Sequence, residues 1–422
     1  MPAPSHNASQ RSTLPPILHG LSQRELEAAA RGSLSRFSPV KWRMIRIADA
    51  MVTPLVRAVD SRAPRSDSGA KRIDKILVVE YGQLGDVAMV LPFLKNLRLH
   101  YPEAHIVLAG NPRHLALLES ENLVDELVAV EAPWCVIQSR WTKHIPFSGL
   151  WRRLAQVTRA LRKEKFDLAI NPRGDIRDNW FLWGTRARIR LGYAIYGGRC
   201  FLTDVAAPDI EHPHYTNRWL HLLEHLGKPI LDTRPLLKLT PADHEGAARF
   251  LAHQGVSGED LVIGLHPGAR VPTRQWGEEN FRAVGQRLAT QFSAKILWFE
   301  EPHSTAATGS GFVRVALPLR EFAAVLARCN VVVCNDSGPM HVAAALGARV
   351  VAIFGPNIPA CYGPIGDQNR TVIREGFWCR PCADRCIFDQ PYCLRTIPVE
   401  EVVQAAAELL APNVAQPVQA GA

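Results

Sequence analysis

Two stretches of this chain repeat the same order of short apolar strand, glycine-containing turn and helix, and this repeat constrains the fold more than any other feature. The first stretch begins at Ile76–Glu80 and the second at Leu261–Leu265. Strands that alternate with helices pair in parallel, because each helix returns the chain to the same end of the sheet. We therefore predict an α/β protein of two Rossmann-like units whose parallel sheets face a central cleft suited to a nucleotide.

The predicted elements divide the chain into four parts. The pattern lapses between Asp204 and Thr240, where Pro, His and Asp accumulate, so we place the change of domain there. The predicted parts are a basic extension and linker (1–70), a first unit (71–240), a second unit (241–395) and a final helix with a tail (396–422). Strands are predicted at 76–80, 105–109, 126–130, 168–170, 261–265, 296–299, 331–334 and 350–355, and helices from about 86 to 100 and at 151–165, 278–291, 319–328 and 398–410.

Composition limits the class of protein. The chain has 422 residues, of which 47% are hydrophobic and 21% charged, which is typical of a globular protein. No apolar run approaches the roughly 18–20 residues that span a bilayer, and the polar start does not resemble a signal peptide, so we expect a cytoplasmic protein. The net charge of +9 favours acidic partners, such as nucleotides, phosphorylated glycolipids or an anionic membrane.

The extension contains a basic amphipathic segment, 37–62, in which Arg43, Arg46 and Arg57 alternate with apolar side chains such as Met44 and Met51. Two interpretations stay open. The segment suits an anionic membrane surface. It equally suits a helix that packs on the main body with its basic face in solvent. A second helix is predicted at 23–31 and a linker at 62–71.

The turn after the predicted strand 331–334 has the features of a phosphate site. Asp336 or Ser337 can cap the helix that follows, and Pro339 suits its first turn. The backbone amides of Ser337, Gly338 and Met340 are then expected to point outward at the positive end of the helix dipole. An ordinary capped turn is the alternative interpretation. The phosphate site is favoured because other candidate loops follow neighbouring strands.

The loop Gly82-Gln83-Leu84-Gly85-Asp86 follows the first strand. Its glycines allow a close approach of substrate, and Asp86 could accept a proton from an attacking hydroxyl. The alternative role of Asp86 is to cap the helix. The glycine spacing differs from the dinucleotide-binding pattern, so a NAD site is not predicted.

The loop His266–Trp276 combines a glycine turn with Arg270 and Arg274, and an arginine there could neutralise a leaving diphosphate. Glu301 follows another strand and could accept ribose hydroxyls, although paired surface acids are common. His341 faces either a diphosphate or its own helix. Arg173, after the strand at 168–170, suits an anionic acceptor or a solvated surface equally.

Four cysteines, Cys379, Cys382, Cys386 and Cys393, have a spacing that resembles a metal site. The alternatives are a reduced loop packed against its unit and adventitious disulfides, and together they are favoured over a metal because the spacing of the second pair is irregular. We therefore predict no metal at this segment and keep zinc as the weaker alternative.

Four segments together resemble glycosyltransferase family 9, the ADP-heptose:lipopolysaccharide heptosyltransferases. They are Ile76–Pro92, Ile263–Trp276, Asn335–Gly347 and Val351–Pro364, in the order and spacing of that family, and the cysteine-rich end is similar too. The resemblance covers about residues 74–410. The strand before Glu301 lacks the glycines that many members have, and the extension 1–70 lies outside the family core.

The resemblance implies a GT-B fold, with the acceptor in the first unit, the nucleotide sugar in the second and a final helix that crosses back. It implies inverting transfer without metal or cofactor, with Asp86 as base and Arg274 at the donor phosphates. The other candidate donor-binding residues are His266, Gly268, Thr273, Trp276, Glu301, Asp336, Ser337, Gly338, Pro339, Met340, His341, Gly355 and Pro356. The candidate acceptor-binding residues are Gly82, Gln83, Gly85 and Arg173.

The predicted function is therefore transfer of heptose from ADP-heptose to a lipopolysaccharide core acceptor, either lipid A-Kdo or an inner-core heptose. The expected partners are the nucleotide sugar, a lipid-linked glycan and, through the extension, the cytoplasmic face of the inner membrane, with no nucleic acid. Two alternatives stay open: another nucleotide sugar or acceptor, and an idle nucleotide-sugar binding protein. The presence of Asp86 and Arg274 argues against the idle protein.

Overall fold

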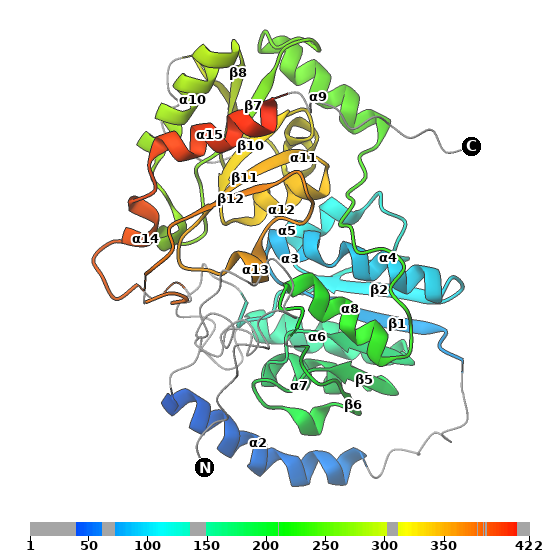
Figure 1. Ribbon diagram of the computed structural model, residues 1–422. Helices are drawn as coiled ribbons and strands as arrows, with labels where there is room; N and C mark the ends of the chain where they lie inside the picture. The colour runs from blue at the N-terminus through cyan, green and yellow to red at the C-terminus, as the bar shows by residue number, and fades with distance from the viewer. Residues whose placement is uncertain are drawn as a thin grey trace, which may run out of the picture. The chain divides into compact units, whose positions relative to one another are not determined.

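The computed structural model describes most of the chain and divides it into two compact units (Figure 1). Unit 1 runs to Pro235 and takes in the short segments Ala360–Tyr362 and Pro381–Ala383, and unit 2 holds the rest from Leu236. The predicted helix 23–31 and the predicted linker 62–71 both lie outside the described residues. The described residues are 39–60, 72–135, 149–209, 211–301, 311–377, 379–382, 384 and 386–411.

Unit 1 is built on a six-stranded, wholly parallel sheet of order β3-β2-β1-β4-β5-β6. Apolar runs form its central strands, because strands covered on both faces need apolar side chains throughout. Its strands are β1 (Lys75–Glu80), β2 (His105–Gly110), β3 (Glu126–Ala129), β4 (Leu168–Asn171), β5 (Ile189–Gly192) and β6 (Asp204–Val205). Its helices include α2 (Pro39–Asp60), α3 (Leu84–Met89), α4 (Leu91–His100), α5 (Pro112–Leu115), α6 (Gly149–Lys163), α7 (Ile176–Thr185) and α8 (Tyr215–His225).

Unit 2 repeats this plan with the order β12-β11-β10-β7-β8-β9, again wholly parallel. Its strands are β7 (Val262–His266), β8 (Lys295–Phe299), β9 (Val313–Val315), β10 (Val331–Asn335), β11 (Arg349–Phe354) and β12 (Arg370–Ile373). Its helices are α9 (Pro241–His253), α10 (Glu278–Phe292), α11 (Leu319–Leu326), α12 (Gly338–Ala345), α14 (Tyr392–Arg395) and α15 (Val399–Leu410). Helix α13 (Pro359–Tyr362) belongs to unit 1 from its second residue on.

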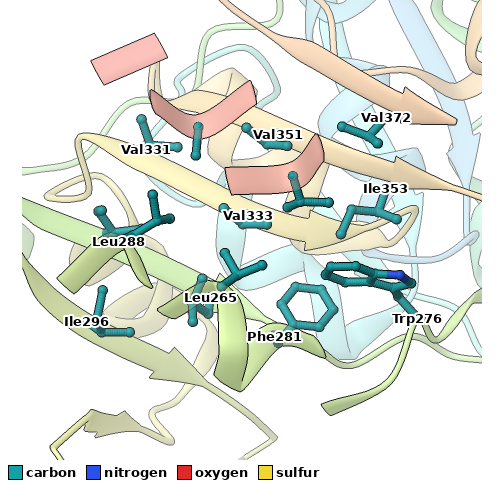
Figure 2. Packing of buried hydrophobic residues seen from close by; sticks show 14 of the residues in the cluster. Leu265, Trp276, Phe281, Leu288, Ile296, Val331, Val333, Val351, Ile353 and Val372 are labelled. Atoms are coloured by element: carbon teal, nitrogen blue, oxygen red, sulfur yellow. The ribbon is translucent and has the colours of Figure 1, made fainter. Parts of the chain in front are cut away.

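One apolar core of unit 2 lies between the sheet and two helices. Alternate side chains of β7, β10 and β11 meet Phe281 and Leu288 of α10, and Trp276 closes one end (Figure 2). The final helix α15, expected from the family resemblance to cross back, adds Val402 and Ala406 to this same core.

The predicted fold class, two Rossmann-like units with parallel sheets, is confirmed. Several details differ from the expectation. The short strands β5, β6, β9 and β12 and the helices α7 and α9 were not among the predicted elements. The helix predicted to run to His100 is divided at Val90 into α3 and α4. Helix α8 forms within residues 204–240, where the sequence pattern predicts no helix. It forms because its residues bury one apolar face, which includes Trp219 and Leu223.

In the part of the chain that the structure describes, no helix combines the length and apolar character needed to cross a membrane.

Candidate functional site

The candidate donor residues of unit 2 gather where its strand order reverses. Strands β7 and β10 are neighbours in the sheet, with Cys334 opposite His266, whereas the chain leaves them toward opposite edges. The two carboxyl ends therefore open a crevice, which is where α/β sheets bind ligands. His266 ends β7 and Asn335 ends β10, so the two strongest sequence motifs lie side by side.

Asn335 holds the two loops of this crevice together. Its side-chain N–H donates to the Pro267 carbonyl oxygen at 2.7 Å, and its carbonyl oxygen accepts from the Trp276 amide at 3.2 Å. Asn335 is fully buried, so both bonds are shielded from water. The loop after β7 is thereby fixed over the end of β10.

Asp336 and Arg274 form the charged part of this site. The buried Asp336 carboxylate accepts a hydrogen bond from Asn357 Nδ2 at 2.5 Å and lies 3.5 Å from Arg274 Nη1. Burial raises the pKa of the Asp336 carboxyl, against the opposing effect of Arg274. Arg274 also donates two bonds of 2.7 Å to the two carboxylate oxygens of Asp384, which is the fork geometry that an arginine offers to a carboxylate or phosphate.

Three polar atoms at this crevice are buried without a hydrogen-bond partner among the described residues: His266 Nδ1, Thr273 Oγ1 and Ser337 Oγ. Buried polar groups of folded proteins are nearly always paired, so such a cluster calls for an explanation, and a bound ligand supplies one. Burial lowers the pKa of His266 to about 4, so its ring is neutral at physiological pH. All three residues are among the candidates named from the sequence.

The turn into α12 differs in two ways from the expectation. Ser337 is the residue before the first helical turn, but its hydroxyl makes no capping bond, and Asp336 bonds to Asn357 instead. The prediction that the Met340 amide points outward is wrong, because that amide donates to the Ser337 carbonyl oxygen at 3.2 Å. The first-turn residues Gly338 and Pro339 remain at the positive end of the helix.

The other donor candidates fall into supporting and exposed groups. Trp276 is fully buried and its indole N–H donates to the Ile397 carbonyl oxygen at 3.0 Å, so its side chain supports the loop from inside the core. Glu301 is exposed, whereas its neighbour Glu300 pairs with Arg314. His341 and Pro356 are buried. The two glycine candidates allow close packing, because a side chain at Gly268 would meet the His266 ring at 3.1 Å and one at Gly355 would meet Leu394 at 3.2 Å.

In unit 1 the carboxyl ends of β1 and β4 form the equivalent crevice, since the strand order reverses between them. Asp86 is the third residue of α3 and accepts a hydrogen bond from the Gln83 amide at 2.6 Å, so it completes a capping box in which Gln83, and not Asp86, is the N-cap residue. Capping uses only one carboxylate oxygen and does not exclude a role as base. Gly85 is buried in the same turn.

A second carboxyl group lies beside Asp86. Glu80, the last residue of β1, is fully buried and accepts hydrogen bonds from the Gly82 amide at 2.7 Å and from the Tyr215 hydroxyl at 3.3 Å. A side chain at Gly82 would meet both Asp86 Oδ2 and Glu80 Oε1, so only glycine lets the two carboxyl groups come this close. Burial, with the charge of Asp86, raises the pKa of the Glu80 carboxyl to about 8.

Arg173, a candidate acceptor residue, belongs to a buried cluster around Asp178. Its Nε donates to Asp178 Oδ2 at 3.1 Å, and the Tyr81 hydroxyl and Trp134 indole N–H both donate to Asp178 Oδ1 at 2.6 Å. Burial raises the pKa of Asp178, and Arg173 opposes that rise. The cluster adjoins the Gly82 loop through Tyr81.

An open apolar pocket of about 310 Å³ has Trp134 in its lining. The Arg177 guanidinium lies 5.7 Å from the centre of the Trp134 ring, which is a cation–π distance. Aromatic walls with one cation suit the apolar face of a sugar or a lipid chain near an anionic group. The lining residues are Trp134, Trp151, Ile176, Arg177, Trp180 and Phe201.

The four clustered cysteines are free thiols. Within the described ranges, no group of three His, Cys, Asp or Glu side chains is arranged to hold a metal ion.

Sequence reasoning missed several polar residues of these sites: Glu80, Asp178, Tyr215, Asn335 and Asp384. Glu80 and Asn335 carried a usable signal, because each is a polar residue that closes an apolar strand run. The pairing of Asp384 with Arg274 joins residues 110 positions apart, and no local pattern points to it.

Comparisons with known proteins agree on one family. The chain matches the sequence model described as glycosyltransferase family 9 (heptosyltransferase) over residues 154–392. A lipooligosaccharide heptosyltransferase 2 from Haemophilus influenzae is 27% identical over 323 residues, which cover 71% of this chain and 88% of that protein.

Solved structures are similar as well. The glycosyl transferase family 9 protein from Veillonella parvula superposes with a TM-score of 0.68 at 25% identity, over 81% of this chain and 99% of that one. The ADP-heptose lps heptosyltransferase II from E. coli superposes with a TM-score of 0.63 at 21% identity, over 80% and 98% respectively, a likeness that concerns the fold.

Proposed function

The chain belongs to glycosyltransferase family 9, as its resemblance predicted, and we propose from this that it transfers a heptose from ADP-heptose to a lipopolysaccharide core acceptor. Glycosyl transfer is the activity of the family, and its relatives from Haemophilus influenzae and E. coli are named as heptosyltransferases. The identity of the donor sugar, the acceptor (lipid A-Kdo or an inner-core heptose) and the inverting mechanism are the proposed part.

The observation that carries the proposal is the set of unpartnered polar atoms at the β7–β10 crevice. His266, Thr273 and Ser337 present buried acceptor or donor atoms beside Arg274 and the N-terminus of α12. A nucleoside diphosphate sugar offers hydroxyls and phosphate oxygens that can pair with all of these groups. Unit 2 therefore holds the donor in this proposal.

The proposed reaction is a direct displacement at the anomeric carbon. Asp86 takes the proton from the acceptor hydroxyl as its oxygen forms the new bond to that carbon. The bond from the anomeric carbon to the phosphate oxygen breaks, and its electron pair leaves with ADP, so configuration inverts. Arg274 and the amides at the start of α12 stabilise the negative charge on the departing diphosphate. The proposal needs no metal ion or other cofactor.

Unit 1 binds the acceptor in this proposal. Gly82, Gln83 and Gly85 surround Asp86, and the Asp178 cluster with Arg173 adjoins them through Tyr81. The apolar pocket lined by Trp134 is available to a further part of the glycolipid. Since such an acceptor is anchored in lipid, we place the protein at the cytoplasmic face of the inner membrane, with nucleic acid excluded as a partner.

The first test is calorimetric binding of ADP, UDP and GDP, each alone and as a sugar conjugate, to the full chain in the presence of EDTA. We expect preference for ADP and ADP-heptose, followed by transfer to a delipidated core acceptor. A preference for another nucleotide would retain the family and reject ADP-heptose as donor. Donor binding without transfer to any core acceptor would favour the idle binding protein.

A further inference from the structure

Helix α2 is part of unit 1, and one of its two different faces is fastened to the rest of that unit. Asp60 accepts from Arg190 Nη2 at 2.6 Å, from Arg186 Nη1 at 3.0 Å and from Trp183 Nε1 at 3.0 Å. Because Arg190 is buried, the loss of its carboxylate partner would be costly. These contacts hold the C-terminal end of α2 against unit 1.

The rest of the inner face is fastened along its length. Asp49 Oδ1 accepts from the Gly198 amide at 3.0 Å, and Val56 is buried. A side chain at Gly197 would meet Ile45 Cγ2 at 3.0 Å, so the helix packs closely on this loop. The orientation of α2 about its own axis is therefore set.

The opposite face is an exposed apolar stripe. Met44, Ile47, Met51 and Leu55 recur at intervals of three and four residues, so they lie on one side of the helix. Their exposed fractions are 65%, 60%, 70% and 69%. Four large apolar side chains in one row are unusual on a surface that meets only water, and they indicate a binding surface.

Charge on α2 is divided between the two faces. Arg43, Arg46 and Arg57 are exposed, and at about 100° per residue they project from one side of the helix, between the stripe and the inner face. The acidic residues of the helix, Asp49 and Asp60, both point to unit 1. The outward face therefore combines apolar side chains with positive charge, which suits a surface with a negative boundary over an apolar interior.

We propose that α2 lies flat on an anionic lipid bilayer, with the stripe of Met44, Ile47, Met51 and Leu55 inserted among the lipids and the arginines paired with headgroup phosphates. The inference rests on the membrane location proposed above and names the element responsible for it. A second copy of the chain is a poorer occupant, because its own α2 carries the same positive charge.

The test is sedimentation of the full chain with vesicles of phosphatidylcholine alone and of phosphatidylcholine with one quarter phosphatidylglycerol. We expect wild-type protein to sediment with the anionic vesicles, and Met51→Gln/Leu55→Gln to bind them at least about tenfold more weakly, because two inserted apolar side chains are lost. The matched control is Leu99→Gln/Leu231→Gln, which changes two exposed apolar residues elsewhere in unit 1 and should bind as wild type does. Arg43→Gln/Arg46→Gln/Arg57→Gln should remove the preference for anionic vesicles.

Three outcomes would overturn the inference. The first is that wild-type protein fails to bind anionic vesicles, and the second is that the α2 variant binds them as well as the control variant does. The third is that wild-type protein sediments as a dimer whereas the α2 variant is a monomer, because a second copy of the chain would then cover the stripe. Transfer to a delipidated acceptor separates this inference from the proposed function. All variants should retain this transfer activity. If wild-type protein lacked it, the proposed function would be rejected, whereas the vesicle-binding result would still support the role of α2. Circular dichroism of each variant confirms folding.

Discussion

At the scale of single residues, the two sites differ in how their polar groups are satisfied. In unit 1 the Glu80 and Asp86 carboxyl groups share the space that Gly82 leaves open, and each has a backbone amide as a partner. In unit 2, buried atoms of His266, Thr273 and Ser337 lack partners among the described residues. The first arrangement raises the pKa of Glu80, and the second leaves buried polar atoms with which a ligand can pair.

Asp86→Asn tests the base. An asparagine side chain can still accept the Gln83 amide, so the start of α3 should persist while the proton acceptor is lost. We expect kcat to fall by about 10²–10⁴, with donor affinity unchanged. Transfer kinetics and calorimetry measure both quantities. An equal loss of melting temperature or of donor affinity would instead assign Asp86 a structural role.

Glu80→Gln tests the raised pKa. With a folded-state pKa of about 8 and an ordinary value of 4.5, the folded protein binds more protons than the unfolded chain between these limits. The free energy of unfolding of wild type should therefore fall as pH rises from about 5 to about 8, and Glu80→Gln should weaken this fall. Urea unfolding at pH 6 and pH 9 gives the comparison, with the exposed Glu103→Gln as control. Parallel pH dependence in all three proteins would contradict the assignment.

Thr273→Val and Ser337→Ala test the unpartnered hydroxyls. Each removes a buried group that has no partner among the described residues, so the stability of the ligand-free protein should be unchanged or slightly higher. Affinity for ADP-heptose should fall about five- to tenfold for each, the equivalent of roughly one hydrogen bond. Thermal melts and calorimetry supply the two readouts. A loss of stability with unchanged affinity would mean that the hydroxyls serve the fold.

At the scale of elements, loops are held by side chains at strand ends. Asn335, which ends β10, joins Pro267 to Trp276, and Asn357, which follows β11, reaches the Asp336 carboxylate. Strand ends are the rigid points of a parallel sheet, so they position loops that carry function. The proposed donor site therefore depends on three strands at once.

Asn335→Ala should separate these loops. It leaves a buried carbonyl oxygen at Pro267 and a buried amide at Trp276 unpaired, at a cost of about 2–4 kcal/mol in the free energy of unfolding. Asn330→Ala, which removes one bond to the Val262 amide at the other end of the sheet, should cost about 1 kcal/mol and leave donor affinity intact. Urea unfolding and ADP titration distinguish them. Equal effects of the two variants on ADP affinity would contradict the role given to Asn335.

At the scale of the whole molecule, each unit is a complete Rossmann-like sheet with its own core and its own reversal point in strand order. Such units can bind their ligands separately, since each crevice is formed by strands of one sheet. We propose that unit 2 binds the donor because its crevice holds Arg274 and the unpartnered polar atoms, and that unit 1 binds the acceptor because its crevice holds Asp86.

Hydrogen exchange tests that division. ADP should slow the exchange of backbone amides in the loop after β7 and in the turn after β10, because binding stabilises what it contacts. The loop at Gly82 and the first turn of α3 should change little with ADP alone. Mass spectrometry of peptic fragments measures both regions in one experiment. Protection confined to the unit 1 loop would reverse the assignment of the donor.

The sequence by itself determined the alternation of strands and helices and the order of the strands that it predicted, because long apolar runs, glycines and helix starts are local features that a short window contains. It therefore predicted the fold class and the strand-end loops in which most candidate residues lie, but not the short strands β5, β6, β9 and β12. Tertiary structure alone decided which strands are neighbours, and so it brought His266 beside Asn335. It also paired Arg274 with Asp384 and Asp60 with Arg190, 110 and 130 positions apart. Contacts between residues more than a hundred positions apart depend on the strand order of a whole sheet, and a local sequence pattern contains no information about that order.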